Sequence, residues 1–125
     1  MKILWLSESR PLPRQIDALM RRFNVTERDI VHDNKHFQDA EEIVRRFRES
    51  GYDELVFFSS LGAIGRLCEM GARPYYPVME RVMAKDRERA DLVVGRRSNE
   101  RFFRFVKFRR AGRVIIEFVE GDEFE

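Results

Sequence analysis

An apolar run, a polar turn and an amphipathic stretch follow one another three times in the first part of the chain. The apolar runs are Ile3–Leu6, Ile30–Val31 and Leu55–Phe58. Short continuous apolar runs are typical of strands that are buried on both faces, and the amphipathic stretches between them are typical of crossover helices. A βαβαβα order favours a parallel sheet with right-handed crossovers. The repeat therefore predicts an α/β domain.

Cap residues predict the bounds of three helices. Proline suits the first turn of a helix, acidic residues and serine suit its N-terminal end, and a glycine just past the last turn stops it. The first stretch begins at Pro13 and is followed by Asn24, and the other two are followed by Gly51 and Gly71. The helices are therefore expected from Pro13 to about Phe23, from Asp39 to Gly51, and from Ser59 or Ser60 to Gly71.

The third apolar run is the clearest strand signal in the chain. It lies within residues 54–59 and is too hydrophobic for a strand with one face in water, so this strand is predicted to be central. Strands over 2–7 and 29–32 are expected beside it. The most buried residues are expected to include Leu4, Leu6, Val56, Phe57 and Phe58.

After Gly71 the pattern changes. Residues 75–83 fit a strand that begins at Pro77, although one side of a helix also fits, and the strand is preferred. Residues 101–109 and 113–119 then predict an antiparallel hairpin around a tight turn, with Gly112 in a left-handed conformation.

The length of 125 residues suits a single domain over 1–125. We expect a βαβαβα core over 1–72 and a β-rich extension over 73–125 that contains the hairpin 101–119. The layout resembles that of Rossmann-like nucleotide sensors and small enzymes at the level of fold. This resemblance implies a three-layer Rossmann-like domain, here with a C-terminal antiparallel hairpin.

Composition narrows the class of protein. Cys68 is the only cysteine, which excludes an intramolecular disulfide and favours a reducing compartment, so a cytoplasmic protein is expected. No apolar run approaches the ~20 residues of a membrane span. Charged residues make up 37% of the chain, which suits a thermophile, but the net charge of only +2 does not by itself indicate a nucleic-acid binder.

Polar clusters follow each of the three apolar runs. Ligands of open α/β sheets collect where the carboxyl ends of the strands line up. A serine pair and a glycine at a helix start can bind phosphate, and an acid after the second strand can bind ribose hydroxyls. The same residues also serve as ordinary caps and turns. The predicted ligand-binding residues are Ser7, Glu8, Asp33, Ser59, Ser60 and Gly62.

Glu8 and His32 are the candidates for general acid or base catalysis, and the sequence does not decide whether the protein is an enzyme. His32 and His36 have the spacing of a helical metal site, but the Asp-Asn pair between them favours a turn, so no metal is expected. The chain has neither a Walker loop nor a G-x-G-x-x-G fingerprint, and no cofactor is predicted.

A basic, Phe-rich segment supports an alternative function. Rings that alternate with cations on a strand can bind single-stranded nucleic acid by stacking and charge. The nucleic-acid contacts of this alternative are Arg101, Phe103, Arg104, Phe105, Lys107, Arg109 and Arg110.

Apolar side chains on both faces of the predicted hairpin also favour a homodimer through it, centred on Phe103 and Phe105, since one face would lie open in a monomer. The acidic residues of 117–125 would then meet the partner's basic residues in 96–113. The preferred function is binding of a small anionic ligand, a nucleotide or other phosphate ester. The alternatives are a nucleic-acid-binding accessory protein and a structural or interaction protein without a ligand.

Overall fold

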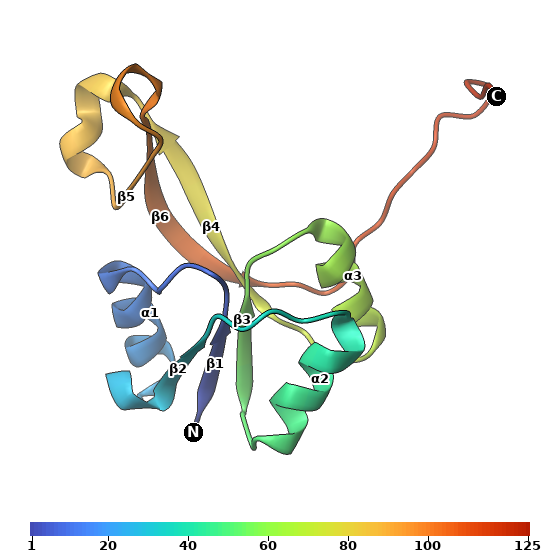
Figure 1. Ribbon diagram of the computed structural model, residues 1–125, viewed down its shortest axis with the longest axis horizontal. Helices are drawn as coiled ribbons and strands as arrows, with labels where there is room; N and C mark the ends of the chain where they lie inside the picture. Colours follow the sequence, from blue (N-terminus) through green and yellow to red (C-terminus); the bar gives the residue numbers. More distant parts are fainter.

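The computed structural model describes residues 1–125 and is built on one six-stranded sheet with the strand order β2-β1-β3-β4-β6-β5 (Figure 1). The strands are β1 (Ile3–Leu6), β2 (Ile30–Asp33), β3 (Glu54–Phe57), β4 (Tyr75–Val82), β5 (Leu92–Val94) and β6 (Arg101–Arg110). The helices are α1 (Pro13–Phe23), α2 (Ala40–Glu49) and α3 (Leu61–Glu69), with 3-10 turns η1 (Glu27–Asp29), η2 (Ala84–Arg89) and η3 (Arg97–Asn99).

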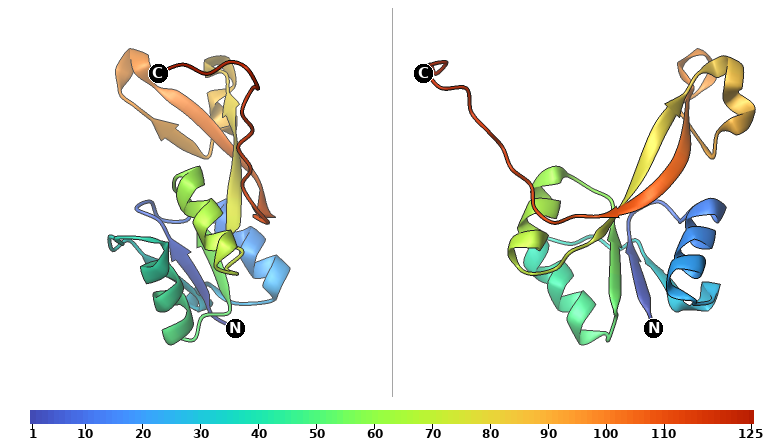
Figure 2. Two further views of the ribbon diagram at one scale, coloured as in Figure 1. Left: turned by 90° about the vertical axis from the view of Figure 1, so that its right-hand side faces the viewer. Right: turned by 180° about the vertical axis from the view of Figure 1, so that it is seen from behind.

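The parallel part of the sheet is covered by helices on both faces. β1 lies between β2 and β3 in parallel register, and β3 meets β4 in parallel at Val56. Because successive side chains of a strand point to opposite faces, Leu4 and Leu6 pack with α2 and α3, whereas Ile3 and Trp5 pack with α1. Figure 2 shows these helices on the two sides of the sheet. All four side chains of β1 are therefore buried.

The expectation of a mixed α/β domain is confirmed, and β3 is central as predicted. Leu4, Leu6, Val56 and Phe57 are buried. The prediction for Phe58 is wrong: its side chain is 47% exposed, because β3 ends at Phe57 and Phe58 already belongs to the polar turn.

The cap residues act at the helix ends where they were expected. The Asp39 carboxylate accepts a hydrogen bond from the Glu42 N–H (2.9 Å), and the Ser60 hydroxyl accepts one from the Ala63 N–H (3.2 Å). Gly51 follows α2 with a φ of +71°, a left-handed conformation that favours glycine. The three helices thus begin and end within a residue or two of the predicted bounds.

The C-terminal half forms an antiparallel ribbon that projects beyond the helical layers (Figure 1). Residues 75–82 form a strand, as preferred from the sequence, and β6 pairs with this strand along its whole length. On its other side, β6 pairs with β5 over residues 101–103. The Rossmann-like layout is therefore matched only in the parallel part of the sheet.

The predicted hairpin 101–119 is wrong. Residues 113–119 are extended and pair with no strand, and Gly112 has no positive φ. After β6, the Ala111 N–H donates to the Pro74 carbonyl (2.9 Å), and Val114 packs against α3 beside Gly65. These contacts lead the chain across α3 instead of back along β6. The dimer surface expected on this hairpin is also wrong, because Phe105 is 3% exposed within a single chain.

A β-bulge joins the ribbon to the core. The register between β4 and β6 shifts at Val78 and Met79, so that Val106 is left without an opposite residue. The extra residue places Phe105 and Phe108 on the same face, with ring centroids 4.9 Å apart. Phe108 in turn meets Trp5 of β1 edge-on at 6.1 Å.

Asp91 links three segments beside this bulge. One carboxylate oxygen accepts hydrogen bonds from the Phe105 N–H (2.8 Å) and from Arg14 of α1 (2.7 Å). The same Arg14 nitrogen donates to the Phe105 carbonyl (2.9 Å). Asp91 therefore holds the loop before β5 against both α1 and β6.

No helix has both the length and the apolar character that crossing a bilayer requires.

Replacing Asp91 by alanine is expected to lower the free energy of unfolding by about 2 kcal/mol, because the part-buried Phe105 N–H loses its acceptor and Arg14 loses its counter-charge. Urea denaturation followed by circular dichroism measures the change. Glu88→Ala is the control, since Glu88 is an exposed carboxylate with no ion pair. Equal stabilities of the two variants would contradict the linking role of Asp91.

Gly95→Ala is expected to loosen the connection between β5 and β6. Gly95 has a φ of +99°, and a Cβ there would collide with the Asn99 carbonyl oxygen. A side chain in such a conformation costs about 1–3 kcal/mol. Hydrogen exchange of residues 92–103 should accelerate in this variant and stay unchanged in Gly112→Ala, because a Cβ at Gly112 meets nothing within 4 Å. If hydrogen exchange of residues 92–103 is unchanged in Gly95→Ala as well, the prediction is wrong, because the chain then accommodates the added Cβ without loosening this connection.

Candidate functional site

The carboxyl ends of β1, β2 and β3 open into one cavity of about 480 Å³. The turns that follow these strands supply its walls. Of the predicted ligand-binding residues, Ser7, Glu8, Asp33 and Ser59 line the cavity, and Ser60 and Gly62 do not. The parallel register explains the convergence, because Leu6, Asp33 and Phe57 end their strands at the same level.

Arg46 of α2 holds the turn after β2 in place. Its guanidinium donates to the Lys35 carbonyl (3.2 Å) and to the His36 carbonyl, and it lies 3.5 Å from the Asp33 carboxylate. It also pairs with Glu42 at 2.8 Å. The Gln38 N–H and this guanidinium hold the pKa of Glu42 below its ordinary value. One wall of the cavity is thus fixed by an ion-paired network.

The turn after β1 is held by its neighbours. The Trp5 indole N–H donates to the Ser9 carbonyl (2.9 Å), and the Ser9 N–H donates to the Ser7 hydroxyl (3.2 Å). His32 Nε2 lies 2.8 Å from the Ser7 carbonyl, and the Ser7 N–H donates to the Asp33 carbonyl (3.3 Å). The turns after β1 and β2 are therefore tied together into one frame.

Several polar side chains that line the cavity have no partner in the protein, and they include one acid and one base. The Glu8 carboxylate and the Lys35 ammonium line the cavity, are exposed, and make no ion pair. The Ser59 hydroxyl makes no hydrogen bond and lies at the opposite wall, after β3. The cavity thus offers a hydrogen-bond acceptor, a cation and a hydroxyl that no protein group uses.

The start of α3 lies next to Ser59. The Ser60 hydroxyl is occupied by the Ala63 N–H, which makes it a cap and not a free ligand group. The N–H groups of Leu61 and Gly62, in the first turn, have no intrahelical acceptor. Gly62 has open space around its Cα, so a bound group would meet no side chain there.

Aromatic rings form the apolar part of the wall. Phe58 lines the cavity with 47% of its surface exposed, and its ring packs on Tyr76 at 5.5 Å. Phe37 lies on the other side and packs on Phe57 at 5.7 Å. An exposed ring beside a polar cavity is available for stacking against a planar ligand.

The two catalytic candidates have different surroundings. His32 lies on β2, and its ring contacts the Ser7 carbonyl. The ring therefore links β2 to the turn after β1 and does not line the cavity. Glu8 does line the cavity and is unpaired. No group of three or more His, Cys, Asp or Glu side chains is arranged to hold a metal ion.

The predicted nucleic-acid contacts are spread over both faces of β6. Arg104 pairs with Glu80 at 2.8 Å, and Arg110 pairs with Glu54 and lies over the Tyr75 ring. Phe105 is buried, and Phe103 is half-buried. Arg101, Lys107 and Arg109 are exposed and make no ion pair. Only these three cations stand free on the strand.

Sequence reasoning missed three residues in or beside the cavity, which are Lys35, Phe58 and Arg46. Lys35 and Phe58 both lie at or near the ends of predicted strands. A lysine in a turn and an apolar residue in a strand are common, however, and do not by themselves indicate a binding site. Arg46 follows Glu42 by four residues, a spacing that predicts a helical ion pair and not a reach back to Lys35. Only the packing of α2 on the sheet brings Arg46 to the turn.

Comparison of the chain with protein-family models, with curated proteins and with solved structures gives no match.

Proposed function

We propose that the protein binds a small anionic ligand, a nucleotide or other phosphate ester, in the cavity at the carboxyl ends of β1, β2 and β3. The observation that supports the proposal most is the convergence of three polar turns on one cavity in which Glu8, Lys35 and Ser59 have no protein partner. Polar groups that are held in a rigid frame and left unpaired are typical of small-molecule sites.

The three free groups suit different parts of such a ligand. The Lys35 ammonium attracts a phosphate, and the Ser59 hydroxyl and the first N–H groups of α3 can donate hydrogen bonds to it. The Glu8 carboxylate repels a phosphate but accepts hydrogen bonds from ribose hydroxyls. The exposed Phe58 ring can stack on a base. A nucleotide uses all of these groups, whereas inorganic phosphate uses only some of them.

A nucleotide that binds here is expected to raise the melting temperature of the protein. At a concentration of about 100 times the dissociation constant, the stabilisation is about 2.7 kcal/mol. Lys35→Ala should weaken binding at least about tenfold, because it removes a charge-assisted hydrogen bond. The measurement is a thermal-shift screen with nucleoside mono-, di- and triphosphates, followed by titration calorimetry.

Lys85→Ala is the matched control, since Lys85 is an exposed lysine of η2 outside the cavity. A shift that Lys35→Ala and Lys85→Ala reduce equally would show binding elsewhere. Absence of a shift with every phosphate compound would contradict the proposal and favour an interaction protein without a small ligand.

A second candidate function is binding of single-stranded nucleic acid along β6, favoured by the three exposed, unpaired cations Arg101, Lys107 and Arg109. Arg104 and Arg110 contribute less, because each is paired with a carboxylate. Stacking on Phe105 is not available, since that ring is buried against α1, and Phe103 is the ring that remains.

Binding of a labelled oligonucleotide, measured by fluorescence anisotropy, is expected to weaken with salt. Each phosphate contact contributes about −0.7 to the slope of log K against log salt concentration. The double variant R101A/R109A should make the slope less steep by about two such contributions. R28A/R45A, which removes two exposed arginines far from β6, is the control. Salt-independent or absent binding would remove this candidate.

A further inference from the structure

The C-terminal tail, residues 115–125, exposes large apolar side chains to solvent. Ile116, Phe118, Val119 and Phe124 are 75%, 83%, 73% and 94% exposed, and no strand pairs with any of these residues. A run of exposed large apolar side chains is unusual on a monomer and marks a binding surface. The tail carries acidic residues and no base: Glu117, Glu120, Asp122, Glu123 and Glu125.

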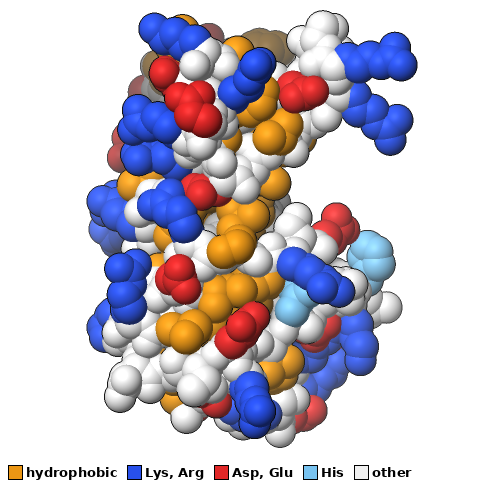
Figure 3. Space-filling view, turned by 90° about the vertical axis from the view of Figure 1, so that its left-hand side faces the viewer, with side chains coloured by type: hydrophobic (Ala, Val, Ile, Leu, Met, Phe, Trp, Pro, Cys, Tyr) orange, Lys and Arg blue, Asp and Glu red, His pale blue; other side chains and the backbone are white.

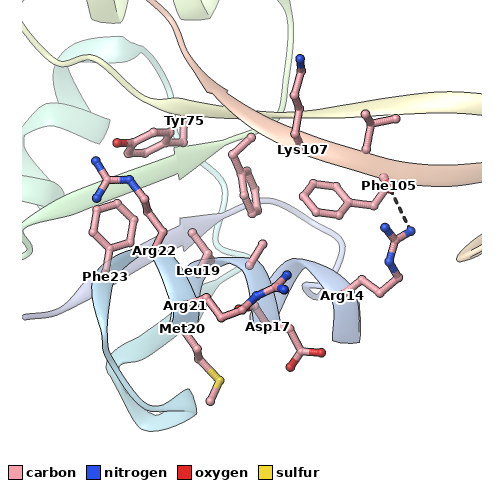
Figure 4. A pocket seen from close by; sticks show the side chains of 13 residues that line it. Arg14, Asp17, Leu19, Met20, Arg21, Arg22, Phe23, Tyr75, Phe105 and Lys107 are labelled. Atoms are coloured by element: carbon pink, nitrogen blue, oxygen red, sulfur yellow. Dashed lines mark hydrogen bonds between the residues drawn. The ribbon is translucent and has the colours of Figure 1, made fainter.

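An apolar groove of about 650 Å³ lies elsewhere on the molecule, between α1 and β6 (Figure 4). Leu19 and Phe23 of α1 and Phe105 of β6 point into it, and Tyr75 closes one end. Figure 3 shows the surrounding face, where hydrophobic side chains form a band with Lys and Arg beside it and a few Asp and Glu among them.

The rim of this groove is basic. Arg14, Arg21 and Arg22 of α1 line it together with a single acid, Asp17. Arg21 and Arg22 are exposed and make no ion pair, whereas Arg14 is already bound to Asp91. The charge of the rim is thus opposite to that of the tail, and its apolar floor suits the exposed side chains of the tail.

One edge of β6 is open beside the groove. β5 covers this edge only over residues 101–103. At Phe105, the backbone N–H and carbonyl are bonded to the side chains of Asp91 and Arg14 instead of to a strand. These side chains occupy the edge at Phe105, so an added strand can pair only beyond it, over residues 106–110, where β6 has no second neighbouring strand. Residues 115–120, which are extended and rich in β-branched and aromatic side chains, have the composition of such a strand.

The tail does not reach the groove of its own chain. Val114 packs beside Gly65 of α3, on the face of the sheet opposite α1. From there the tail runs away from α1 (Figures 1 and 2). The occupant that fits the groove is therefore the tail of another molecule.

We propose that two copies of this chain exchange their C-terminal tails, residues 115–120 of each lying along β6 in the groove between α1 and β6 of the other. Ile116 and Phe118 share one face of the extended tail and cover the half-buried rings of Phe23, Tyr75 and Phe108, which line the groove. The acids of the tail meet Arg21 and Arg22. Because the exchange is reciprocal, it closes as a two-fold dimer and buries the same contact twice. This proposal is independent of the ligand site, because that cavity lies at the carboxyl ends of β1, β2 and β3 and shares no lining residue with the groove.

The first test is the mass in solution at micromolar concentration, measured by sedimentation equilibrium. The full chain is expected at twice its 15.0 kDa, and the variant I116S/F118S at 15.0 kDa. Because these two side chains are so exposed within one copy, their loss leaves the fold of the single chain intact, which circular dichroism checks. A dimer that survives I116S/F118S would overturn the proposal, and so would a monomeric full chain, whether its tail amides exchange freely or are protected by folding back.

Charge reversal tests the groove. R21E/R22E is expected to raise the dimer dissociation constant at least about tenfold, and E117K/E120K added to it should restore part of the loss, because the opposite charges face each other again. R28E/R45E, which reverses two exposed arginines away from the groove, is the matched control and should leave dissociation unchanged. If R21E/R22E and R28E/R45E raise the dissociation constant equally, the effect comes from the net charge of the protein, and the assignment of the groove is overturned.

Complementation tests the exchange itself. I116S/F118S has an intact groove and R21E/R22E an intact tail, so a tagged copy of one variant should capture the other, while neither captures itself. Failure of the two variants to associate, when the tagged full chain captures untagged full chain, would show that tail and groove do not meet.

Discussion

Burial of β1 and β3 on both faces is the constraint on which the rest of the structure depends. Every side chain of β1 is less than 4% exposed, and Leu55, Val56 and Phe57 of β3 are buried as well. A strand without a solvent face needs a layer on each side and neighbours at both edges. The sheet satisfies this with α1 on one face, α2 and α3 on the other, and β2 and β4 at the edges of the pair.

The ribbon formed by β4 and β6 depends on this core through a small number of contacts. A bulge at Val106 turns Phe105 and Phe108 toward Trp5, and Asp91 binds both Arg14 and the Phe105 N–H. Beyond these contacts, β4, β5 and β6 lie outside the helical layers (Figure 2). Residues 92–94 are accordingly exposed even though they form a strand. The ribbon is an extension of the sheet with one open edge, and the same bulge that anchors it shapes the groove beside α1.

The candidate ligand site and the groove follow from the same topology in different ways. Parallel strands end at one edge, so the turns after β1, β2 and β3 are brought together whatever their sequences are. Which of their groups remain free is then decided by neighbours. Arg46 pairs with Asp33 and donates hydrogen bonds to the carbonyls of the turn, and the Ala63 N–H donates to the Ser60 hydroxyl. Glu8 and Lys35 are left without a partner.

By itself, the sequence determined the elements whose signals are local. The period of the apolar residues and the caps at Pro13, Asp39 and Ser60 predicted the parallel core and the helix bounds, because each signal acts within a few residues of the place where it is read. The strand order, with β6 beside β4 and β5, was decided only by the tertiary structure. The apolar alternation of 101–109 and 113–119 fits a hairpin as well as it fits the observed arrangement, in which the chain leaves β6 and crosses α3. Contacts between distant residues, such as Val114 with Gly65 and Ala111 with Pro74, decide between the two. The exposure of Phe58 and the reach of Arg46 belong to the same class, since a side chain's surroundings are set by the packing of whole elements and leave no periodic signal in the chain.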